Sequence, residues 1–192
     1  MKRLLTHPAI YQFYQELGGF FAARVEAIRE YLPIAPGARI IDIGCGPGYI
    51  VRHLPAAIDY VGLDIDRPSI DFANARFGDR GKFQTRFFDA AAVEDLGPAD
   101  IVMMNGVMHH IGDADLAATL AHVRAVLRPG GTLYLSWRVT PEADRRDGDG
   151  RLYAAFDASV VRAALGAATV LHDQESVSAS SAKVIHRIIA RV

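Results

Sequence analysis

A glycine-rich turn at residues 42–48 constrains the fold of this 192-residue chain more than any other segment. The turn reads Asp-Ile-Gly-Cys-Gly-Pro-Gly and follows a short apolar run at 39–43 of the kind that is buried in parallel sheets. Where side chains are absent, the backbone can approach a ligand closely. The segment therefore predicts an open α/β sheet with a ligand at the carboxyl end of its first strand.

Strand-like runs recur after this turn, separated by intervals that are mostly long enough for a crossover helix. They cover residues 60–65, 82–88, 100–104 and 132–137. The clearest crossover helix spans 113–127, with Asp113 as its predicted N-cap. Residues 168–174 and 183–192 are expected to form two closing strands, and their short link favours antiparallel pairing. The pattern predicts a doubly wound α/β sheet.

We expect a single domain, residues 1–192, with three parts. Residues 1–37 show helical spacing of apolar residues and form an N-terminal cap, and residues 38–137 form the core around the glycine turn. In the last part, 138–192, an exposed loop at 138–151 precedes a helix that begins at Asp157 and ends at Gly166. The two closing strands follow. A helix is also expected from Tyr49.

Composition excludes several classes of partner and site. The chain has 21 Lys and Arg against 22 Asp and Glu, so it lacks the positive field that favours nucleic acid or an anionic membrane. Its single cysteine, Cys45, excludes an internal disulfide and a zinc site with two thiolates, and no histidine spacing matches a metal motif. No apolar run reaches a membrane-spanning length, and residues 1–8 do not resemble a signal peptide. We expect a cytoplasmic location and no metal.

The spacing of the glycines separates the remaining nucleotide ligands. A phosphate-binding P-loop needs a lysine after its last glycine, and no lysine lies near this turn. A dinucleotide site needs Gly-x-Gly-x-x-Gly, whereas the turn runs Gly44-x-Gly46-x-Gly48, one residue short and stiffened by Pro47. Nucleoside triphosphates are therefore disfavoured, and dinucleotides less strongly.

Three carboxylates are expected at the same edge of the sheet. Asp42 lies in the glycine turn, Asp64 ends the second strand and Asp89 ends the third. Together they would repel a pyrophosphate by on the order of 4 kcal/mol at close range. A cationic ligand with hydroxyls and an amine suits them better: Asp64 would accept hydrogen bonds from two ribose hydroxyls, Asp89 from an adenine amine, and Ile65 would lie on the ring face.

Four motifs in order give the chain a specific resemblance. Residues 40–48 (Ile-Ile-Asp-Ile-Gly-Cys-Gly-Pro-Gly) resemble the first motif of the Rossmann-like class I S-adenosylmethionine-dependent methyltransferases. Residues 61–66, 100–113 and 127–133 resemble their acidic second motif, their fourth-strand motif and their turn into the fifth strand. The resemblance covers about residues 38–137, the predicted core. It implies S-adenosylmethionine as cofactor and a seven-stranded, mostly parallel sheet with an antiparallel last strand.

The resemblance also implies a cofactor site. Gly44 and Gly46 would pass beneath the methionine portion, Asp42 and the backbone of Asn105 would face its ammonium, and Asp64 would hold the ribose. The full predicted cofactor-binding set is Asp42, Gly44, Cys45, Gly46, Gly48, Asp64, Ile65, Asp89, Ala90, Asn105 and Gly106. Within it, Cys45 is expected to be a small packing residue and not a nucleophile.

Two adjacent histidines follow the fourth strand, where cofactor and acceptor would meet. We predict that His109 removes the acceptor's proton and that His110 assists it or braces the loop. The alternative is that both are structural. Trp137, Arg138, Tyr11 and Tyr14 are further candidates for the acceptor pocket or a lid, with simple core packing or solvation as the alternative.

The expected activity is transfer of a methyl group from S-adenosylmethionine to an O, N or S atom, less readily a C atom, of a small metabolite in a biosynthetic pathway. Residues 105–108 (Asn-Gly-Val-Met) lack the Asn/Asp-Pro-Pro-aromatic motif of nucleic-acid amino-methyltransferases. The alternatives are a non-catalytic S-adenosylmethionine-binding or partner-dependent module, and an NAD(P)-dependent oxidoreductase. The short chain leaves no room for an acceptor-recognition domain, so a small acceptor is expected, or one delivered by a partner or by the second subunit of a homodimer.

Overall fold

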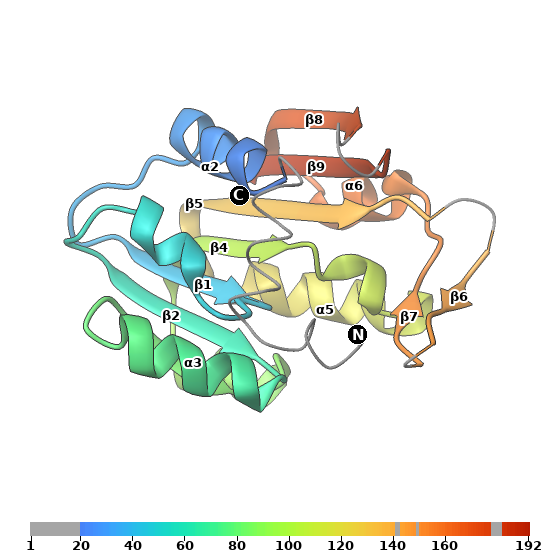
Figure 1. Ribbon diagram of the computed structural model, residues 1–192. Helices are drawn as coiled ribbons and strands as arrows, with labels where there is room; N and C mark the ends of the chain where they lie inside the picture. Colours follow the sequence, from blue (N-terminus) through green and yellow to red (C-terminus); the bar gives the residue numbers. More distant parts are fainter. Residues whose placement is uncertain (1–19, 141–142, 149, 178–181) are drawn as a thin grey trace.

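The structure is a computed structural model that describes residues 20–140, 143–148, 150–177 and 182–192. Seven strands form one sheet in the order β3-β2-β1-β4-β5-β9-β8 (Figure 1). Strands β1 to β5 are parallel, and β9 is antiparallel to both of its neighbours. This confirms the predicted α/β fold. The strands are β1 (Arg39–Ile43), β2 (Asp59–Asp64), β3 (Lys82–Thr85), β4 (Ala99–Asn105), β5 (Leu127–Arg138), β8 (Thr169–Val177) and β9 (Val184–Arg191).

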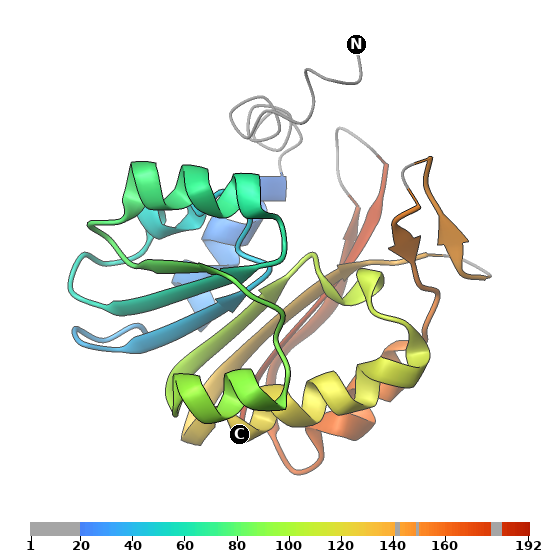
Figure 2. The ribbon, with the colours of Figure 1, turned by 90° about the horizontal axis from the view of Figure 1, so that it is seen from below.

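Helices cover both faces of this sheet (Figure 2). One face carries α2 (Phe20–Tyr31), the 3₁₀ helix η2 (Tyr49–His53) and α3 (Arg67–Phe77); the other carries α4 (Ala90–Leu96), α5 (Asp113–Ala125) and α6 (Ala158–Leu165). Successive strand residues serve opposite faces: Ile40 packs with α2 and α3, whereas Ile41 packs with α4 and α5, and neither is exposed. Burial on both faces explains why the strands are almost continuously apolar.

The carboxyl ends of the central strands meet at one edge, because the parallel strands are nearly in register. Ile43 pairs with Leu63 of β2 on one side and with Met104 of β4 on the other. The strand order reverses between β1 and β4, which is the position where open α/β sheets bind ligands. The last residues of these strands, Asp64 and Asn105 included, are therefore placed around one crevice.

The helix boundaries differ from the predicted ones at two places. Asp157 is the N-cap of α6 and accepts a hydrogen bond from the Ser159 amide (2.7 Å), as predicted. The prediction that Asp113 caps α5 is wrong: Gly112 is the extended residue before the helix, and its carbonyl accepts from the Leu116 amide (3.1 Å). The segment from Tyr49 forms a 3₁₀ helix, not an α-helix.

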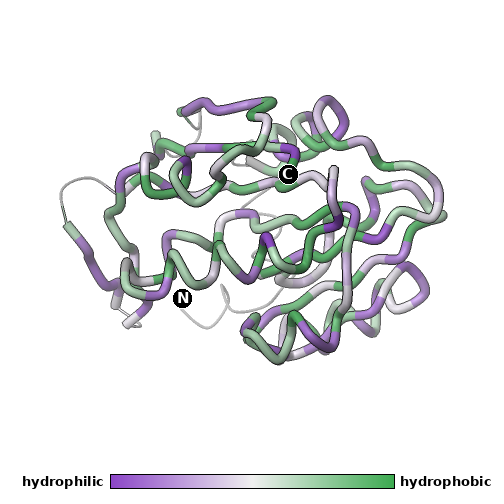
Figure 3. Tube along the Cα trace, turned by 180° about the vertical axis from the view of Figure 1, so that it is seen from behind, coloured by the Kyte–Doolittle hydropathy of each residue, from purple (hydrophilic) through white to green (hydrophobic). Residues whose placement is uncertain are grey.

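Residues 138–151 were predicted to form an exposed loop, but they contain a short strand. β6 (Arg145–Arg146) pairs antiparallel with β7 (Leu152–Tyr153), so a small hairpin stands beyond the end of β5 (Figures 1 and 3). Its residues are mainly hydrophilic (Figure 3). The Ala154 amide donates to the carbonyl of His109 (2.8 Å), which ties the hairpin to η3 (Met108–His110), the 3₁₀ turn after β4.

None of the helices in the described part of the chain has the length and apolar character needed to cross a membrane.

Candidate functional site

The glycine turn leaves β1 in a left-handed path. Gly44 and Gly46 have φ of 71° and 55°, which residues with a side chain rarely adopt. The amides of Gly44 and Cys45 both donate to the carbonyl of Leu63 (2.7 and 3.0 Å), so the turn folds over the end of β2. A Cβ on Gly44 would overlap the Cγ2 methyl of Val107, whereas a Cβ on Gly46 would meet nothing within 4 Å. Gly44 is thus needed for packing, and Gly46 faces open space.

Asp64 is held directly against this turn. Its Oδ2 accepts from the Gly46 amide (2.8 Å) and its Oδ1 from the Asp66 amide (2.9 Å). These bonds fix the carboxylate at the edge of the sheet and leave further lone pairs on both oxygens. The next residue, Ile65, is 72% exposed, which is unusual for a large apolar side chain. A hydrogen-bond acceptor and an apolar surface therefore lie side by side next to the open face of Gly46.

Asp89 and Ala90 lie beyond the neighbouring strand, β3. Asp89 is the N-cap of α4 and accepts from the Ala92 amide through Oδ1 (2.9 Å). Both Asp89 and Ala90 are exposed. The segment between β3 and Asp89 is connected to the glycine turn through Asp64, because the Asp64 carbonyl accepts from the Arg86 amide (2.9 Å).

Asp42 does not join the other two acids at the surface. It is fully buried, and its Oδ2 accepts from the Tyr60 hydroxyl (2.7 Å) and from Arg24 (3.4 Å). Its Oδ1 is buried and has no partner among the described residues. Burial raises the pKa of Asp42, although Arg24 and the Tyr60 hydrogen bond oppose the shift. The expected convergence of three carboxylates is therefore corrected, because Asp42 lies beneath the turn. Spacing did not reveal Arg24 or Tyr60 as its partners.

Cys45 and Gly48 serve the packing of the turn. Cys45 is buried, and its Sγ would lie 2.8 Å from a Cβ on Gly62. Burial, followed by the nearby carboxylate of Asp42, raises the pKa of the thiol well above its ordinary value. The thiol is therefore protonated at neutral pH and unsuited to nucleophilic attack. Gly48, with φ of 74°, packs against Phe83.

Asn105 and Gly106 end β4 on the other side of the crevice. The Asn105 side-chain oxygen accepts from the hydroxyls of Ser136 (2.7 Å) and Tyr134 (3.3 Å), both on β5. The Gly106 amide donates to the carbonyl of Ser136 (2.8 Å), and Gly106 has φ of 69°. The Asn105 side chain therefore supports the turn toward η3.

His109 is buried in η3 and neutral at physiological pH. Its Nδ1 accepts from the Arg138 amide (3.3 Å), so the neutral ring carries its proton on Nε2. Burial, followed by unfavourable electrostatic interactions with His110, Arg138, Arg151 and Lys183, lowers the pKa of His109 to about 3. In this tautomer Nε2 donates a hydrogen bond and cannot accept a proton.

His110 has the opposite tautomer. Its Nδ1 lies 2.6 Å from the carbonyl oxygen of Leu152, which can only accept, so Nδ1 carries the proton and Nε2 has the free lone pair. Burial lowers the pKa of His110, so the neutral form persists below the ordinary titration range. The two rings are 4.1 Å apart, and both face Tyr153, at 5.5 and 5.0 Å.

These hydrogen bonds predict a nitrogen NMR pattern. In ¹⁵N-histidine-labelled protein at pH 7, His110 is expected to be protonated on Nδ1 and His109 on Nε2, because the hydrogen bond of each ring to the backbone selects its tautomer. Two-bond ¹H–¹⁵N spectra read the tautomers directly, and His109→Gln and His110→Gln spectra assign them. Finding both rings in the same tautomer would contradict the geometry.

Burial of neutral His109 also predicts an acid-sensitive stability. The pKa is about 3 in the folded state and 6.5 ordinarily, so the stabilisation is fully present above pH 6.5 and is lost as the pH falls toward 3. Below pH 6.5, this residue is expected to reduce the unfolding free energy by about 1.4 kcal/mol per pH unit. Urea unfolding of the wild type and His109→Gln from pH 7.5 to 5 measures this difference. If the unfolding free energies of the two proteins fell in parallel with pH, the predicted contribution of His109 would be excluded.

The other candidate pocket residues have different surroundings. Trp137 is buried, stacks on His186 at 4.5 Å and packs near Phe156, so it belongs to the core. Arg138 is half-buried at the end of β5, with its guanidinium 5.5 Å from the Tyr153 ring centre. Tyr11 and Tyr14 lie outside the described residues.

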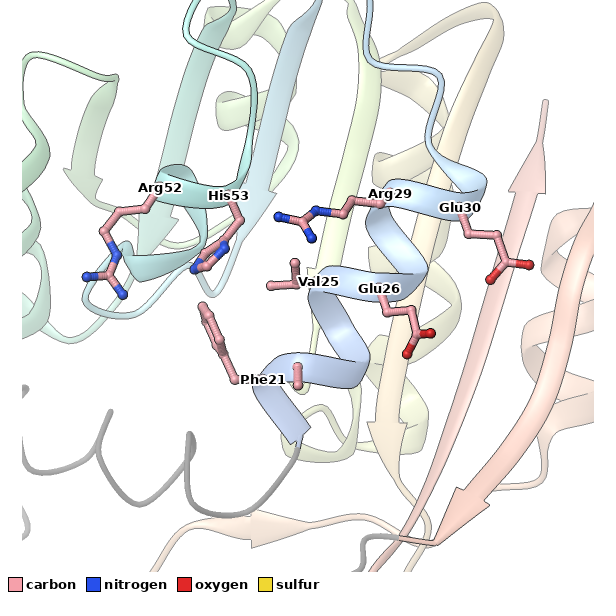
Figure 4. A pocket seen from close by; sticks show the side chains of 8 residues that line it. Phe21, Val25, Glu26, Arg29, Glu30, Arg52 and His53 are labelled. Carbon is pink, nitrogen blue, oxygen red and sulfur yellow. The ribbon is translucent and has the colours of Figure 1, made fainter.

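A cavity of about 800 Å³ opens between α2 and η2 (Figure 4). Phe21 and His53 face each other across it with ring centres 5.2 Å apart, and Arg29 and Glu30 project from α2 (Figure 4). None of the predicted site residues that the structure describes lines it. The site built above therefore lies elsewhere, at the carboxyl ends of β1, β2 and β4.

The segment that contains the glycine turn is similar to known proteins. A family model described as a methyltransferase domain matches residues 41–133, which run from the strand before the glycine turn to β5. An uncharacterized methyltransferase of Mycobacterium tuberculosis is 35% identical over 107 residues, which are 53% of this chain and 51% of the relative. The chain thus spans about half the length of this curated relative.

Two solved structures share the fold. An S-adenosylmethionine-dependent methyltransferase from Mesorhizobium loti superimposes with a TM-score of 0.69 at 18% identity, covering 87% of this chain and 96% of that one. A 1,6-didemethyltoxoflavin-N1-methyltransferase from Burkholderia thailandensis, with bound 1,6-didemethyltoxoflavin and S-adenosylhomocysteine, superimposes with a TM-score of 0.62 at 21% identity. The match covers 94% of this chain and 89% of that one. Residues 41–133 thus match a methyltransferase domain, and together with the shared fold this match supports a class I, Rossmann-like S-adenosylmethionine-dependent methyltransferase.

Proposed function

We propose that this protein transfers a methyl group from S-adenosylmethionine to an O, N or S atom of a small-molecule acceptor. One observation carries the proposal: the Gly46 amide holds the Asp64 carboxylate beside an open glycine face and an exposed Ile65. A ligand with vicinal hydroxyls, a flat ring and a chain that crosses the glycine turn fits these three features together.

Different residues of the crevice bind different parts of the cofactor. Asp64 accepts from the ribose hydroxyls and Ile65 lies on the adenine ring, while Asp89 keeps a second carboxylate oxygen for the adenine amine. The methionine portion crosses Gly46, where no side chain intervenes. Beneath the turn, Asp42 Oδ1 is a buried acceptor without a described partner, which suits the ammonium group. Bound S-adenosylmethionine supplies an electrophilic methyl group on a sulfonium centre.

The protein's own contribution is alignment of the acceptor and removal of its proton. His110 is the better proton acceptor of the histidine pair, because the carbonyl of Leu152 holds its proton on Nδ1 and leaves Nε2 free. His109 is a positioning residue, because the Arg138 amide occupies its Nδ1. This assignment reverses the roles that we inferred from sequence order alone.

A small acceptor is supported by the Burkholderia neighbour, whose structure holds 1,6-didemethyltoxoflavin and matches 94% of this chain. In this protein the β6–β7 hairpin borders the histidine pair through Tyr153. The cytoplasmic location and the homodimer stay predictions, which cell fractionation and sedimentation would test.

Calorimetry tests the cofactor assignment. The full chain is titrated with S-adenosylmethionine, S-adenosylhomocysteine and NAD; both sulfur compounds are expected to bind and NAD is not. Binding of NAD alone would overturn the proposal in favour of an oxidoreductase. If the cofactor binds but no methyl transfer follows with any member of a panel of small phenols, amines and thiols, the non-catalytic alternative replaces it.

A further inference from the structure

Three cations gather beside the histidine pair, and we call Arg138, Arg145 and Lys183 the cationic cluster. Arg138 ends β5, Arg145 lies on β6, and Lys183 immediately precedes β9. The guanidinium carbons of Arg138 and Arg145 lie 5.5 and 5.2 Å from the centre of the same Tyr153 ring. Lys183 is joined to this place by the backbone, because the Val139 amide donates to the Val184 carbonyl (2.9 Å).

No described carboxylate is within ion-pair distance of the cationic cluster. The two described acids of the same segment accept from backbone amides: Asp144 from Ala155 (2.8 Å) and Asp147 from Arg151 (3.0 Å). Some other arginines of the described chain do have carboxylate partners, such as Arg162, which makes two hydrogen bonds to Asp173. The cluster therefore differs from a surface on which the two signs of charge alternate.

The cluster carries an electrostatic cost in the folded state. Burial, followed by the charge of Arg145, lowers the pKa of Arg138, and burial, followed by Arg138 and Arg145, lowers that of Lys183. Arg138 is half-buried, whereas Arg145 and Lys183 are exposed, and like charges that lack a described counter-ion repel one another. An anion among them would remove that repulsion and form charge-assisted hydrogen bonds.

The position of the cluster connects it with the reaction. Tyr153 contacts both arginines on the one hand and the rings of His109 and His110 on the other. The Arg138 backbone amide also donates to His109. A small molecule held by the cluster would therefore lie against Tyr153 with its remaining atoms directed toward the proton acceptor.

We propose that the cationic cluster is a subsite for an anionic group, a carboxylate or a phosphate, on the acceptor. The inference rests on the proposed methyl transfer and narrows its acceptor to an anionic small molecule with a flat or apolar body that packs on Tyr153. The methionine carboxylate of the cofactor has the same chemistry, and the experiment separates the two sources.

The test uses the full chain and two matched probes, benzoate and its uncharged analogue benzamide. Binding is followed by NMR titration of protein saturated with S-adenosylhomocysteine. Benzoate is expected to bind at least tenfold more tightly than benzamide. Arg138→Gln and Arg145→Gln are each expected to weaken benzoate binding about tenfold or more and to leave benzamide unchanged. Arg146→Gln is the control, because Arg146 adjoins Arg145 on β6 but bonds the Gly150 carbonyl (2.8 Å).

The outcomes separate the two proposals. Circular dichroism and the affinity for S-adenosylhomocysteine are measured for every variant. If S-adenosylhomocysteine fails to bind the wild type, the proposed function itself is wrong. If it binds normally but benzoate binds no better than benzamide, the acceptor subsite is wrong. If Arg138→Gln or Arg145→Gln weakens S-adenosylhomocysteine more than benzoate, the cluster serves the cofactor carboxylate and the inference is overturned.

Discussion

Asp64→Ala is expected to weaken S-adenosylhomocysteine binding by about 100-fold or more. The carboxylate would accept from two ribose hydroxyls, and hydrogen bonds to a charged group contribute about 1.5 to 3 kcal/mol each. The substitution also removes the oxygen that accepts from the Gly46 amide (2.8 Å), so the glycine turn loses one of its hydrogen bonds to β2. Isothermal titration calorimetry of the folded variant measures the loss.

Asp71→Ala is the matched control for this prediction. Asp71 lies on α3 and is exposed, and it makes only a loose pair with Arg67 (3.8 Å). It changes the net charge by the same amount, and we expect affinity within twofold of the wild type. Asp64→Asn retains one acceptor oxygen and is expected to fall between the two. An Asp64→Ala affinity within a few-fold of the wild type would mean that the ribose does not lie at Asp64.

The second large effect is expected for Gly44→Ala, as a loss of stability. Gly44 has a left-handed φ of 71°, which destabilises the folded state by about 1 to 2 kcal/mol when the residue has a Cβ. Overlap of this Cβ with the Val107 methyl adds about 1 to 3 kcal/mol. The unfolding free energy is therefore expected to fall by about 2 to 5 kcal/mol. Urea unfolding, monitored by circular dichroism, gives the value.

Gly46→Ala provides the comparison, since Gly46 has a similar φ of 55° but open space around its Cβ position. We expect it to lower the unfolding free energy by only about 1 to 2 kcal/mol and to weaken the cofactor instead, because the methyl group would enter the open face. Shortening the neighbour in Gly44→Ala/Val107→Ala should recover part of the stability. Equal losses for Gly44→Ala and Gly46→Ala, with no recovery in the double variant, would rule out the Val107 overlap.

Local patterns predicted the parts of the fold that local physics determines. The apolar runs located the central strands β1, β4 and β5 because strands that are buried on both faces are apolar almost throughout. Asp157 and Gly166 correctly bounded α6, since capping acts within one helical turn. The β6–β7 hairpin was missed because each strand has two residues, too few for an alternating pattern to be recognised.

Only those parts of the site whose residues lie within one turn or one motif could be predicted from the sequence. The spacing located Gly46 and Asp64 at the same edge, and their hydrogen bond agrees with that. The buried position of Asp42 depends on Arg24 and Tyr60, each 18 residues away. The tautomer of His110 depends on Leu152, which is 42 residues further along the chain. Contacts of this kind arise from the folded arrangement, and no periodicity in one sequence encodes them.

The position of β9 gives the sheet an unusual order of completion during synthesis. β9 lies between β5 and β8, and β8 has no other strand neighbour in the described sheet. Residues 169–177 therefore leave the ribosome before the strand that supplies all of their ladder hydrogen bonds. The free edge of β5 also waits for residues 184–191. A nascent chain that stops short of them leaves one edge of β5 unpaired, and an unpaired strand edge favours aggregation.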